Sequence, residues 1–374
     1  MQAILVTGGT GTLGRAVVRC LVEGEGAAVA AEVGAGGAAG VAGAGAGAGA
    51  GVEGATGVAE AGADAEGAAV AAEAADAGVE VDGEREIRVL SRRPLPSGVS
   101  ASRLGSGTSG TSGAPDPSAG RPSGANEPPV GLPGTPYRHL VGDLLNGDGV
   151  DAAVRGVRAI VHCASMNGKD DVLATRNLID AVRRSGGRPH LVYISIVGID
   201  AIPLPYYRAK LAAERLVMES GLPWSILRAT QFHDLLATVF AYQRWLPVTL
   251  AVKGFRFQPV DVRDVAARLA GLALGEPAGK VPDMGGPQVR DIRDLAATYD
   301  RAYGRRRRVV CLRVPGGIAR GFASGANLVP DHRVGTTTFD DFVARERERE
   351  RGNRQGKGKA AGRVRGVRGP GAEK

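Results

Sequence analysis

Three glycines near the N-terminus recur at a spacing of three, at Gly8, Gly11 and Gly14. An apolar run, 3–6, precedes them and an amphipathic stretch, 15–22, follows, so the sequence predicts a strand, a tight turn and a helix. Such a turn lets the backbone approach a pyrophosphate, which the free N–H groups of the helix N-terminus attract. We therefore expect the phosphates of a dinucleotide to bind here, at Gly8, Thr10, Gly11, Thr12, Leu13 and Gly14. An ordinary glycine turn is the alternative interpretation.

The residues after the second expected strand indicate which dinucleotide would bind. That strand, 86–90, ends in Ser91, Arg92 and Arg93, at a place where a carboxylate usually holds a ribose 2′-hydroxyl. Two guanidiniums suit a 2′-phosphate, because arginine offers a bidentate fork. The sequence thus favours NADP(H) over NAD(H), with a pair of solvated arginines as the alternative.

Two further strand ends carry candidate cofactor contacts. Asp143 and Leu144 follow the third expected strand, and the Asp143 carboxylate could accept a hydrogen bond from an adenine amino group or cap a helix. The residues alone do not decide between these two roles. Ala164 and Ser165 follow the fourth expected strand, and their small side chains would allow a cofactor to approach closely.

Strands alternate with helices along the part of the chain that would position these residues. The alternation predicts parallel β-α-β units, and hence an α/β fold with a Rossmann-type doubly wound parallel sheet. The expected strands are 3–6, 86–90, 139–141, 159–162, 191–194 and 224–227, and the expected helices cover 13–22, 151–154, 171–185 and a stretch from about 207.

Residues 229–344 are less regular and should form a smaller substrate lobe. We expect this lobe to lie over the carboxyl ends of the strands, where ligands bind in such sheets. Within it a helix is expected over 265–274, with Asp264 as its N-cap. The nucleotide-binding domain would then comprise residues 1–228.

Three segments contain too few large apolar residues to build a core. Residues 23–84 are nearly all Ala, Gly, Val and acid, residues 94–136 are rich in Ser, Gly and Pro, and residues 345–374 are highly charged and mostly basic. We expect all three to be disordered, the first two as insertions in the nucleotide-binding domain and the third as a tail.

The net charge and the placement of the cysteines restrict the partners and ligands that the sequence predicts. The formal net charge is +8, which suits anionic ligands, but no aromatic residue interleaves the basic tail, so a nucleic-acid partner is not expected. The three cysteines are scattered, which argues against a disulfide framework and a metal site and fits a reducing cytoplasm. The chain has no stretch apolar enough to predict a membrane span.

Taken together, these stretches resemble the short-chain dehydrogenase/reductase superfamily. The closest branch is the atypical NmrA-like group of NAD(P)H-binding proteins, related to the 39-kilodalton accessory subunit of respiratory complex I. The matching stretches are ILVTGGTGTLG, RVLSRRP, VGDL, AIVHCAS, LVYISIVGID, YYRAKLAAERLVMESGLPWSILRATQFHD, FQPVDVRDVA and DMGGPQV. The resemblance implies a Rossmann fold, a bound nicotinamide dinucleotide and Asp143 at its adenine.

The resemblance also implies a catalytic pair, since this superfamily places a lysine four residues after a tyrosine. Tyr206 and Lys210 fit that spacing, which puts both on one helical face, while Tyr207 should point elsewhere. The phenol would exchange a proton with the reacting oxygen, and the ammonium would lower the phenol pKa and hydrogen-bond the nicotinamide ribose. The superfamily's serine would be Ser195, although the aligned position may instead be Ile196.

Residues after the sixth expected strand should border the nicotinamide and the substrate, at Gln231, Phe232 and His233. His233 could be a proton donor or a packed loop residue. The expected function is hydride transfer between NADPH and a small carbonyl, enone or quinone. The alternative is a redox-sensing NADP(H)-binding protein that acts on a regulatory protein partner without turnover. A transient-oxidation epimerase ranks lowest.

Overall fold

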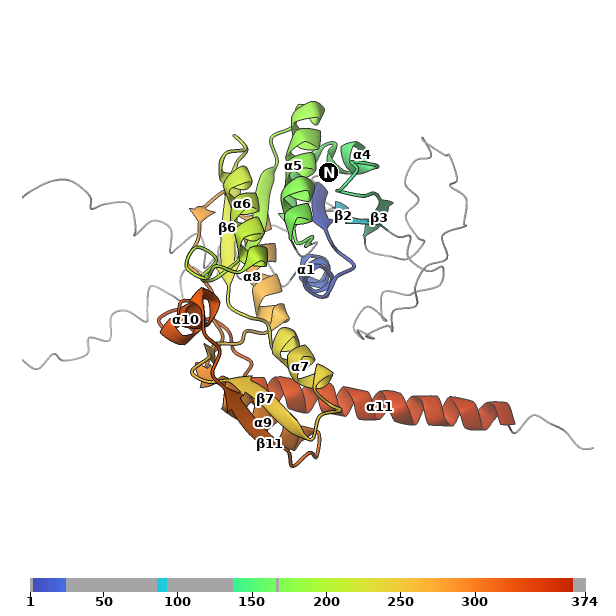
Figure 1. Ribbon diagram of the computed structural model, residues 1–374. Helices are drawn as coiled ribbons and strands as arrows, with labels where there is room; N and C mark the ends of the chain where they lie inside the picture. The colour runs from blue at the N-terminus through green and yellow to red at the C-terminus, as the bar shows by residue number, and fades with distance from the viewer. Residues whose placement is uncertain (1–2, 25–85, 93–136, 166–167, 366–374) are drawn as a thin grey trace, which may run out of the picture.

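The computed structural model describes residues 3–24, 86–92, 137–165 and 168–365 (Figure 1). The two expected insertions, 23–84 and 94–136, lie outside these residues except at the start of the first, and Arg93 lies outside them as well. Glu23 is the last residue of a helix and Gly24, with φ 77°, is its left-handed C-cap. Residues 23 and 24, the start of the first expected insertion, therefore belong to this helix and its cap, and the rest of that prediction lies outside the described residues.

A parallel sheet forms the centre of the molecule, in the order β3-β2-β1-β4-β5-β6-β9. Every pairing within it is parallel. The predicted doubly wound Rossmann sheet is thus confirmed, and each expected strand is present with slightly longer bounds. The strands are β1 Ala3–Thr7, β2 Glu86–Ser91, β3 Arg138–Val141, β4 Val157–His162, β5 His190–Ile196, β6 Trp224–Ala229 and β9 Gly279–Lys280.

Helices cover both faces of this sheet because its strands are apolar on both sides. In β5, Val192 and Ile194 pack into the core beneath α1 (Thr12–Glu23) and α8 (Val262–Leu274). Leu191 and Tyr193 alternate with them and pack on the opposite face, in a second core. That face is covered by α4 (Val150–Val154), α5 (Lys169–Ser185) and α6 (Pro205–Met218) (Figure 1).

Two elements in the region expected to form the substrate lobe belong to the nucleotide-binding domain instead. Helix α8 packs against α1, and β9 pairs with β6 as the seventh strand. The predicted boundary at residue 228 is therefore incomplete, because the chain enters the lobe and then returns. The N-cap prediction is also wrong: Asp261 caps α8 by accepting from the Arg263 N–H at 2.9 Å, and Asp264 lies in the first turn.

The substrate lobe has a separate aromatic core, in which Phe240, Phe257 and Phe322 are buried. A two-stranded parallel ribbon pairs β7 with β11, and a shorter antiparallel one pairs β8 with β10. The lobe elements are α7 His233–Tyr242, β7 Val248–Val252, β8 Arg256–Phe257, β10 Arg290–Asp291, α9 Ile292–Ala302, β11 Arg308–Leu312 and α10 Gly317–Ser324.

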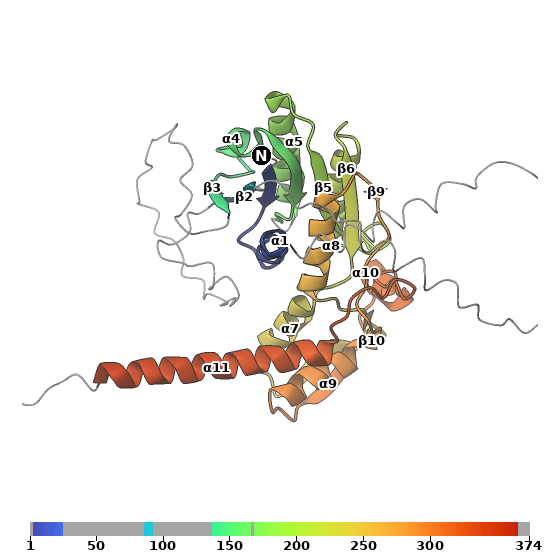
Figure 2. The same cartoon turned by 180° about the vertical axis from the view of Figure 1, so that it is seen from behind.

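The expected disorder of the tail from residue 345 is wrong as far as Arg365. Helix α11 spans Phe339–Arg365, and both views show it projecting from the lobe (Figures 1 and 2). Alternating Arg and Glu side chains form ion pairs one turn apart, such as Arg349 with Glu346 at 2.9 Å. Composition indicated solvation here, but solvated charges at this spacing also stabilise a helix.

Over the described ranges, the helices include none that is long and apolar enough to cross a membrane. The same residues contain no cluster of His, Cys, Asp or Glu side chains that could hold a metal ion.

Candidate functional site

A cavity of about 980 Å³ lies between the carboxyl edge of the sheet and the substrate lobe. Its cofactor half is lined by the glycine turn and by the ends of β2, β3 and β4, at Gly8, Thr10, Gly11, Thr12, Leu13, Gly14, Leu90, Ser91, Arg92, Gly142, Leu144, Cys163, Ala164 and Ser165. Its lobe half is lined by Leu235, Leu236, Val239, Phe240, Leu250, Ala251, Val252, Phe255, Phe257, Ile292 and Phe322. Residues of β5, α6 and the end of β6 lie between the two halves.

The glycine turn has the geometry expected of a phosphate-binding loop. Gly8 has φ 70°, and a Cβ on it would lie 2.8 Å from backbone atoms of Ala164. A Cβ on Gly14 would overlap the carbonyl oxygen of Gly8, so the helix starts directly against the turn. Gly11 is the N-cap of α1 without a side-chain cap, and the first turn holds no acid. The N–H groups there remain available to an anion, so these residues fit a dinucleotide pyrophosphate.

The adenine end of the cofactor half agrees with the prediction in part. Arg92 and Ser91 both line the cavity, and the Ser91 hydroxyl lies 2.7 Å from His139 Nε2. Leu144 lines the cavity, but Asp143 does not. One Asp143 carboxylate oxygen accepts from the Leu145 N–H at 2.9 Å, within a turn; the next helix, α4, has Gly149 as its N-cap, so Asp143 does not cap a helix.

Lys210 lies between the two halves and is buried. Its ammonium donates to the Tyr193 hydroxyl at 3.1 Å and lies 4.6 Å from the centroid of the Tyr193 ring. Burial raises the pKa of Tyr193, with the charges of Asp171 and Glu214 acting in the same direction. A neutral Tyr193 uses one ammonium proton, which leaves others for a ligand in the cavity.

Tyr206 lines the same part of the cavity near the start of α6, where Pro205 is the first helical residue. Its hydroxyl lies 3.1 Å from the Ser165 hydroxyl, and Ser165 donates to the Asp171 carboxylate at 3.3 Å. Tyr207 was expected to point elsewhere, and this is wrong because it also lines the cavity. The cavity thus meets two adjacent phenols.

Ser195 also lines the cavity, but its hydroxyl is hydrogen-bonded to a carboxylate and not to Tyr206. Its hydroxyl donates to Glu214 Oε2 at 2.6 Å, and Glu214 also accepts from Arg228 Nη2 at 2.7 Å. Although Arg228 is desolvated, its bonds to Glu214 and Asp200 raise its pKa. The three buried groups of this network satisfy one another. The hydroxyl that meets Tyr206 is therefore Ser165, whose signal in the sequence was its position after the fourth strand.

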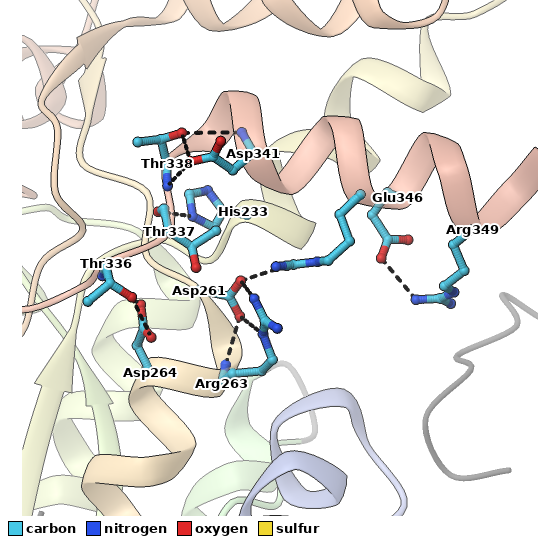
Figure 3. A network of polar contacts seen from close by, with 11 residues as sticks. His233, Asp261, Arg263, Asp264, Thr336, Thr337, Thr338, Asp341, Glu346 and Arg349 are labelled. Atoms are coloured by element: carbon cyan, nitrogen blue, oxygen red, sulfur yellow. Dashed lines mark hydrogen bonds and ion pairs between the residues drawn. The ribbon is translucent and has the colours of Figure 1, made fainter. Parts of the chain in front are cut away.

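Of the predicted substrate residues, Gln231 and Phe232 line the cavity and His233 does not. His233 is buried beneath α11, where its Nε2 lies 3.0 Å from the Thr337 carbonyl and its ring stacks on Phe342 at 5.1 Å (Figure 3). Burial lowers the pKa of His233, so it is neutral at physiological pH. It is the packed residue of the two alternatives.

Figure 3 shows how neighbouring groups fix the same end of α11. Arg345 donates to Asp261 at 2.7 Å, and Asp264 accepts from the Thr336 N–H at 2.9 Å. Burial raises the pKa of Asp261, but bonds from Arg263 and Arg345 outweigh it and hold that pKa at about 2. The ionised N-cap of α8 thereby ties the lobe and α11 to the sheet.

The fold and the glycine turn define a Rossmann-type nucleotide-binding domain. Residues 135–270 match the model of a protein family described as NAD(P)H-binding. The prediction of an NAD(P)H-binding domain is confirmed by this match, which agrees with the resemblance to atypical short-chain dehydrogenases/reductases. A comparison with curated proteins finds no match.

Solved structures share the fold at low sequence identity. An NADPH-dependent quinone oxidoreductase from Escherichia coli, complexed with NADPH, is 15% identical at a TM-score of 0.56, over 91% of this chain and 99% of that one. A nucleoside-diphosphate-sugar epimerase from Staphylococcus aureus is 14% identical at 0.54, over 92% and 100%. A dTDP-glucose 4,6-dehydratase from Bacillus anthracis, in complex with NAD, is 12% identical at 0.55, over 95% and 98%. These likenesses concern the fold.

Proposed function

We propose that this protein is an NADPH-dependent oxidoreductase acting on an apolar carbonyl, enone or quinone. One observation carries the proposal: Tyr206 stands where the cofactor half of the cavity meets the lobe half, 3.1 Å from a second hydroxyl. A proton donor at that junction lies between the cofactor and any substrate in the lobe. The expected cytoplasmic location remains a prediction.

The cofactor half supports the choice of dinucleotide. The helix N-terminus at Gly11 would hold the pyrophosphate, and Arg92 would hold a 2′-phosphate through a charge-assisted bond. Asp143 stands between two residues that line the cavity, Gly142 and Leu144, and its carboxylate would have to turn into the cavity to bind the adenine. Among the structures that share the fold, the quinone oxidoreductase was solved with NADPH.

The residues around Tyr206 would manage the proton. The bound dinucleotide would supply the hydride. Tyr206 would donate its phenolic proton to the oxygen of the acceptor, and the Ser165 hydroxyl would hold the phenol in position. Lys210, directed by Tyr193, would hydrogen-bond the ribose and stabilise the phenolate that remains.

The lobe half favours an uncharged substrate. Its lining side chains are all aliphatic or aromatic, and the charged residues that line the cavity in the described part of the chain are Arg92 and Lys210, at or beside the cofactor half. An ionised substrate would lose its hydration without gaining a partner there. A small apolar acceptor with one reducible oxygen fits this lining.

The test combines calorimetric titration with NADPH and NADH and oxidation of the reduced nicotinamide by quinones and aldehydes. Tyr206→Phe should lower turnover by about 10²–10⁴-fold and leave NADPH affinity within about twofold. Tyr207→Phe is the matched comparison, because this neighbour lines the same cavity. Loss of turnover in Tyr207→Phe alone would reassign the acid, and absence of binding by either dinucleotide would refute the proposal.

A second candidate function rests on Ser195. Its hydroxyl is engaged by Glu214 at 2.6 Å, so the tyrosine lacks the serine partner that the superfamily resemblance implies. This favours a protein that senses NADP(H) through a regulatory partner without turnover. Tight NADPH binding without oxidation by any acceptor, together with an unchanged partner effect in Tyr206→Phe, would support this function.

A further inference from the structure

The outer surface of the substrate lobe carries exposed apolar side chains next to the cavity. On α7, Leu235, Val239 and Tyr242 form one stripe, and the loop that follows presents Trp245 and Leu246. Tyr242 is 79% exposed and Trp245 is 81% exposed. Large apolar side chains grouped in this way on a surface indicate a binding face.

The β7–β11 ribbon extends this face. Its register places Val310 beside Leu250 and Leu312 beside Val252, and the side chains of alternate residues share one side. On the other side Ala251 packs, together with Val309 and Cys311, in the lobe core. The end of α7 meets the ribbon, where Gln243 Oε1 accepts from the Leu250 N–H at 2.7 Å. We call this surface the α7–ribbon face: the exposed Leu235, Val239, Tyr242, Trp245, Leu246, Leu250 and Leu312, together with the half-buried Val310.

Part of the α7–ribbon face also lines the cavity. Leu235, Val239 and Leu250 line its lobe half, and all three are also exposed, Leu235 by 53%. The same side chains therefore form the wall of the cavity and part of the outer surface. A ligand bound to this face would therefore touch three side chains that also line the lobe half.

Basic residues stand at both ends of the ribbon. Arg244 and Arg308 lie where its strands begin, and Lys253 and Arg313 lie where they end, all four exposed. The Arg244 guanidinium lies 5.0 Å from the Trp245 ring centroid. Segments 235–260 and 304–330 contain nine Lys and Arg residues and no Asp or Glu; Asp234 and Asp331 border them, and Arg307 is paired with the buried Asp300. The apolar centre is thus flanked by positive charge, with no acid in these segments.

We propose that the α7–ribbon face docks on an anionic lipid surface, so that the lobe half of the cavity opens toward the bilayer. Tryptophan and tyrosine favour the membrane interface, aliphatic side chains enter the outer acyl region, and nearby Lys and Arg attract anionic headgroups. A second copy of the chain is disfavoured because it would bring these like charges together. An apolar substrate would then pass from lipid to cavity.

Trp245 provides a direct readout, because the chain has two tryptophans. In a Trp224→Phe variant of the full chain, emission reports Trp245. Vesicles of phosphatidylcholine with phosphatidylglycerol should shift this emission to the blue, and brominated acyl chains should quench it. Vesicles of phosphatidylcholine alone should do so far less. No shift with either vesicle overturns the proposal.

Vesicle flotation of single variants tests the two parts of the face. Arg308→Gln and Arg313→Gln should each lower partitioning about fivefold, and Trp245→Ser should lower it more than about tenfold. The controls are Arg176→Gln and Leu173→Ser, at an exposed arginine and an exposed apolar residue on α5. Both should leave vesicle partitioning unchanged.

Equal binding by all variants would assign vesicle binding to another surface and overturn the proposal. Self-association that Trp245→Ser abolishes, or capture of nucleic acid in place of vesicles, would overturn it too. Vesicle binding is measured without dinucleotide, so its outcome is separate from that of the proposed function.

Discussion

The two halves of the cavity are built from opposite materials. The cofactor half consists of backbone turns and polar ends of strands, each held by a short segment such as Gly8–Gly14 or Leu90–Arg92. The lobe half consists of aliphatic and aromatic side chains brought together from α7, β7, β8, α9 and α10. The residues expected to bind the dinucleotide are therefore close together in the sequence. The residues that make the substrate pocket apolar come from distant parts of the chain and meet only when the lobe packs.

The largest expected effect tests whether the backbone of the turn carries dinucleotide binding. Gly8→Ala places a Cβ 2.8 Å from the Ala164 backbone and a side chain at φ 70°, so the turn must shift. We expect NADPH affinity to fall by about 100-fold or more, since the phosphate loop and the adjoining β4 end move together. Calorimetric titration measures it.

Gly156→Ala is the matched control for this change. Gly156 has φ 67° but nothing within 4 Å of an added Cβ. It should cost about 1–2 kcal/mol of stability from the backbone conformation and leave NADPH affinity unchanged. Equal affinities in the two variants would show that the glycine turn does not hold the phosphates.

A smaller effect is expected at the other end of the cofactor half. Arg92→Ala removes a charge-assisted contact to a 2′-phosphate, worth about 1.5–3 kcal/mol, so NADPH affinity should fall by roughly 10–100-fold. NADH affinity should change little, which makes the ratio of the two dissociation constants the readout. A parallel loss for both dinucleotides would assign Arg92 to a contact that both share.

A substitution in the lobe half should change the KM for the acceptor and leave NADPH affinity unchanged. Leu235→Asn replaces an exposed aliphatic wall of the cavity with an amide, and it should raise the KM for an apolar acceptor about tenfold. NADPH affinity should stay constant. Leu173→Asn, an exposed leucine on α5 outside the cavity lining, is the control. A change in NADPH affinity with Leu235→Asn would mean that the two halves are coupled.

The features that could be predicted from the sequence follow the same division between local and distant residues. The glycine turn, the strands from β1 to β6 and the Tyr206–Lys210 pair each depend on residues close in the chain, and patterns of two, three or four residues reveal them. Composition misjudged the start of the tail, 345–351, because alternating Arg and Glu can stabilise a solvated helix as readily as they mark disorder.

The remainder depends on contacts between distant residues. The side-chain direction of Ser195 is set by Glu214 and Arg228, and no local pattern specifies which hydroxyl meets Tyr206. His233 occurs within a motif that suggests a pocket, yet Phe342, more than a hundred residues later, covers it. The two-residue strand β9 has no periodicity to detect, so its return to the sheet was invisible.

The smallest expected effect is a change in the pH dependence of folding stability, caused by the buried side chain of His162. His162 ends β4, with its Nδ1 2.7 Å from the Thr7 hydroxyl and its Nε2 3.1 Å from that of Thr175. Burial lowers its pKa to about 3, and the charge of Lys210 adds to this. Below the model-peptide value of 6.5 the unfolded chain binds a proton here and the folded chain does not, so stability falls as the pH falls from 6.5 toward 3.

This linkage predicts a loss of roughly 1 kcal/mol between pH 8 and pH 6 from His162 alone. Denaturant unfolding of wild type and His162→Asn at both pH values measures it, since the variant should show a correspondingly smaller loss. His332→Asn, at an exposed histidine, should retain the wild-type loss. The other buried histidines shift both curves alike, so the difference between the curves isolates His162. If His162→Asn and wild type lost the same stability between pH 8 and pH 6, the His162 imidazole would have to titrate alike in the folded and unfolded protein. The buried polar groups around His162 would then be accessible to water, as the exposed residues of the lobe half are.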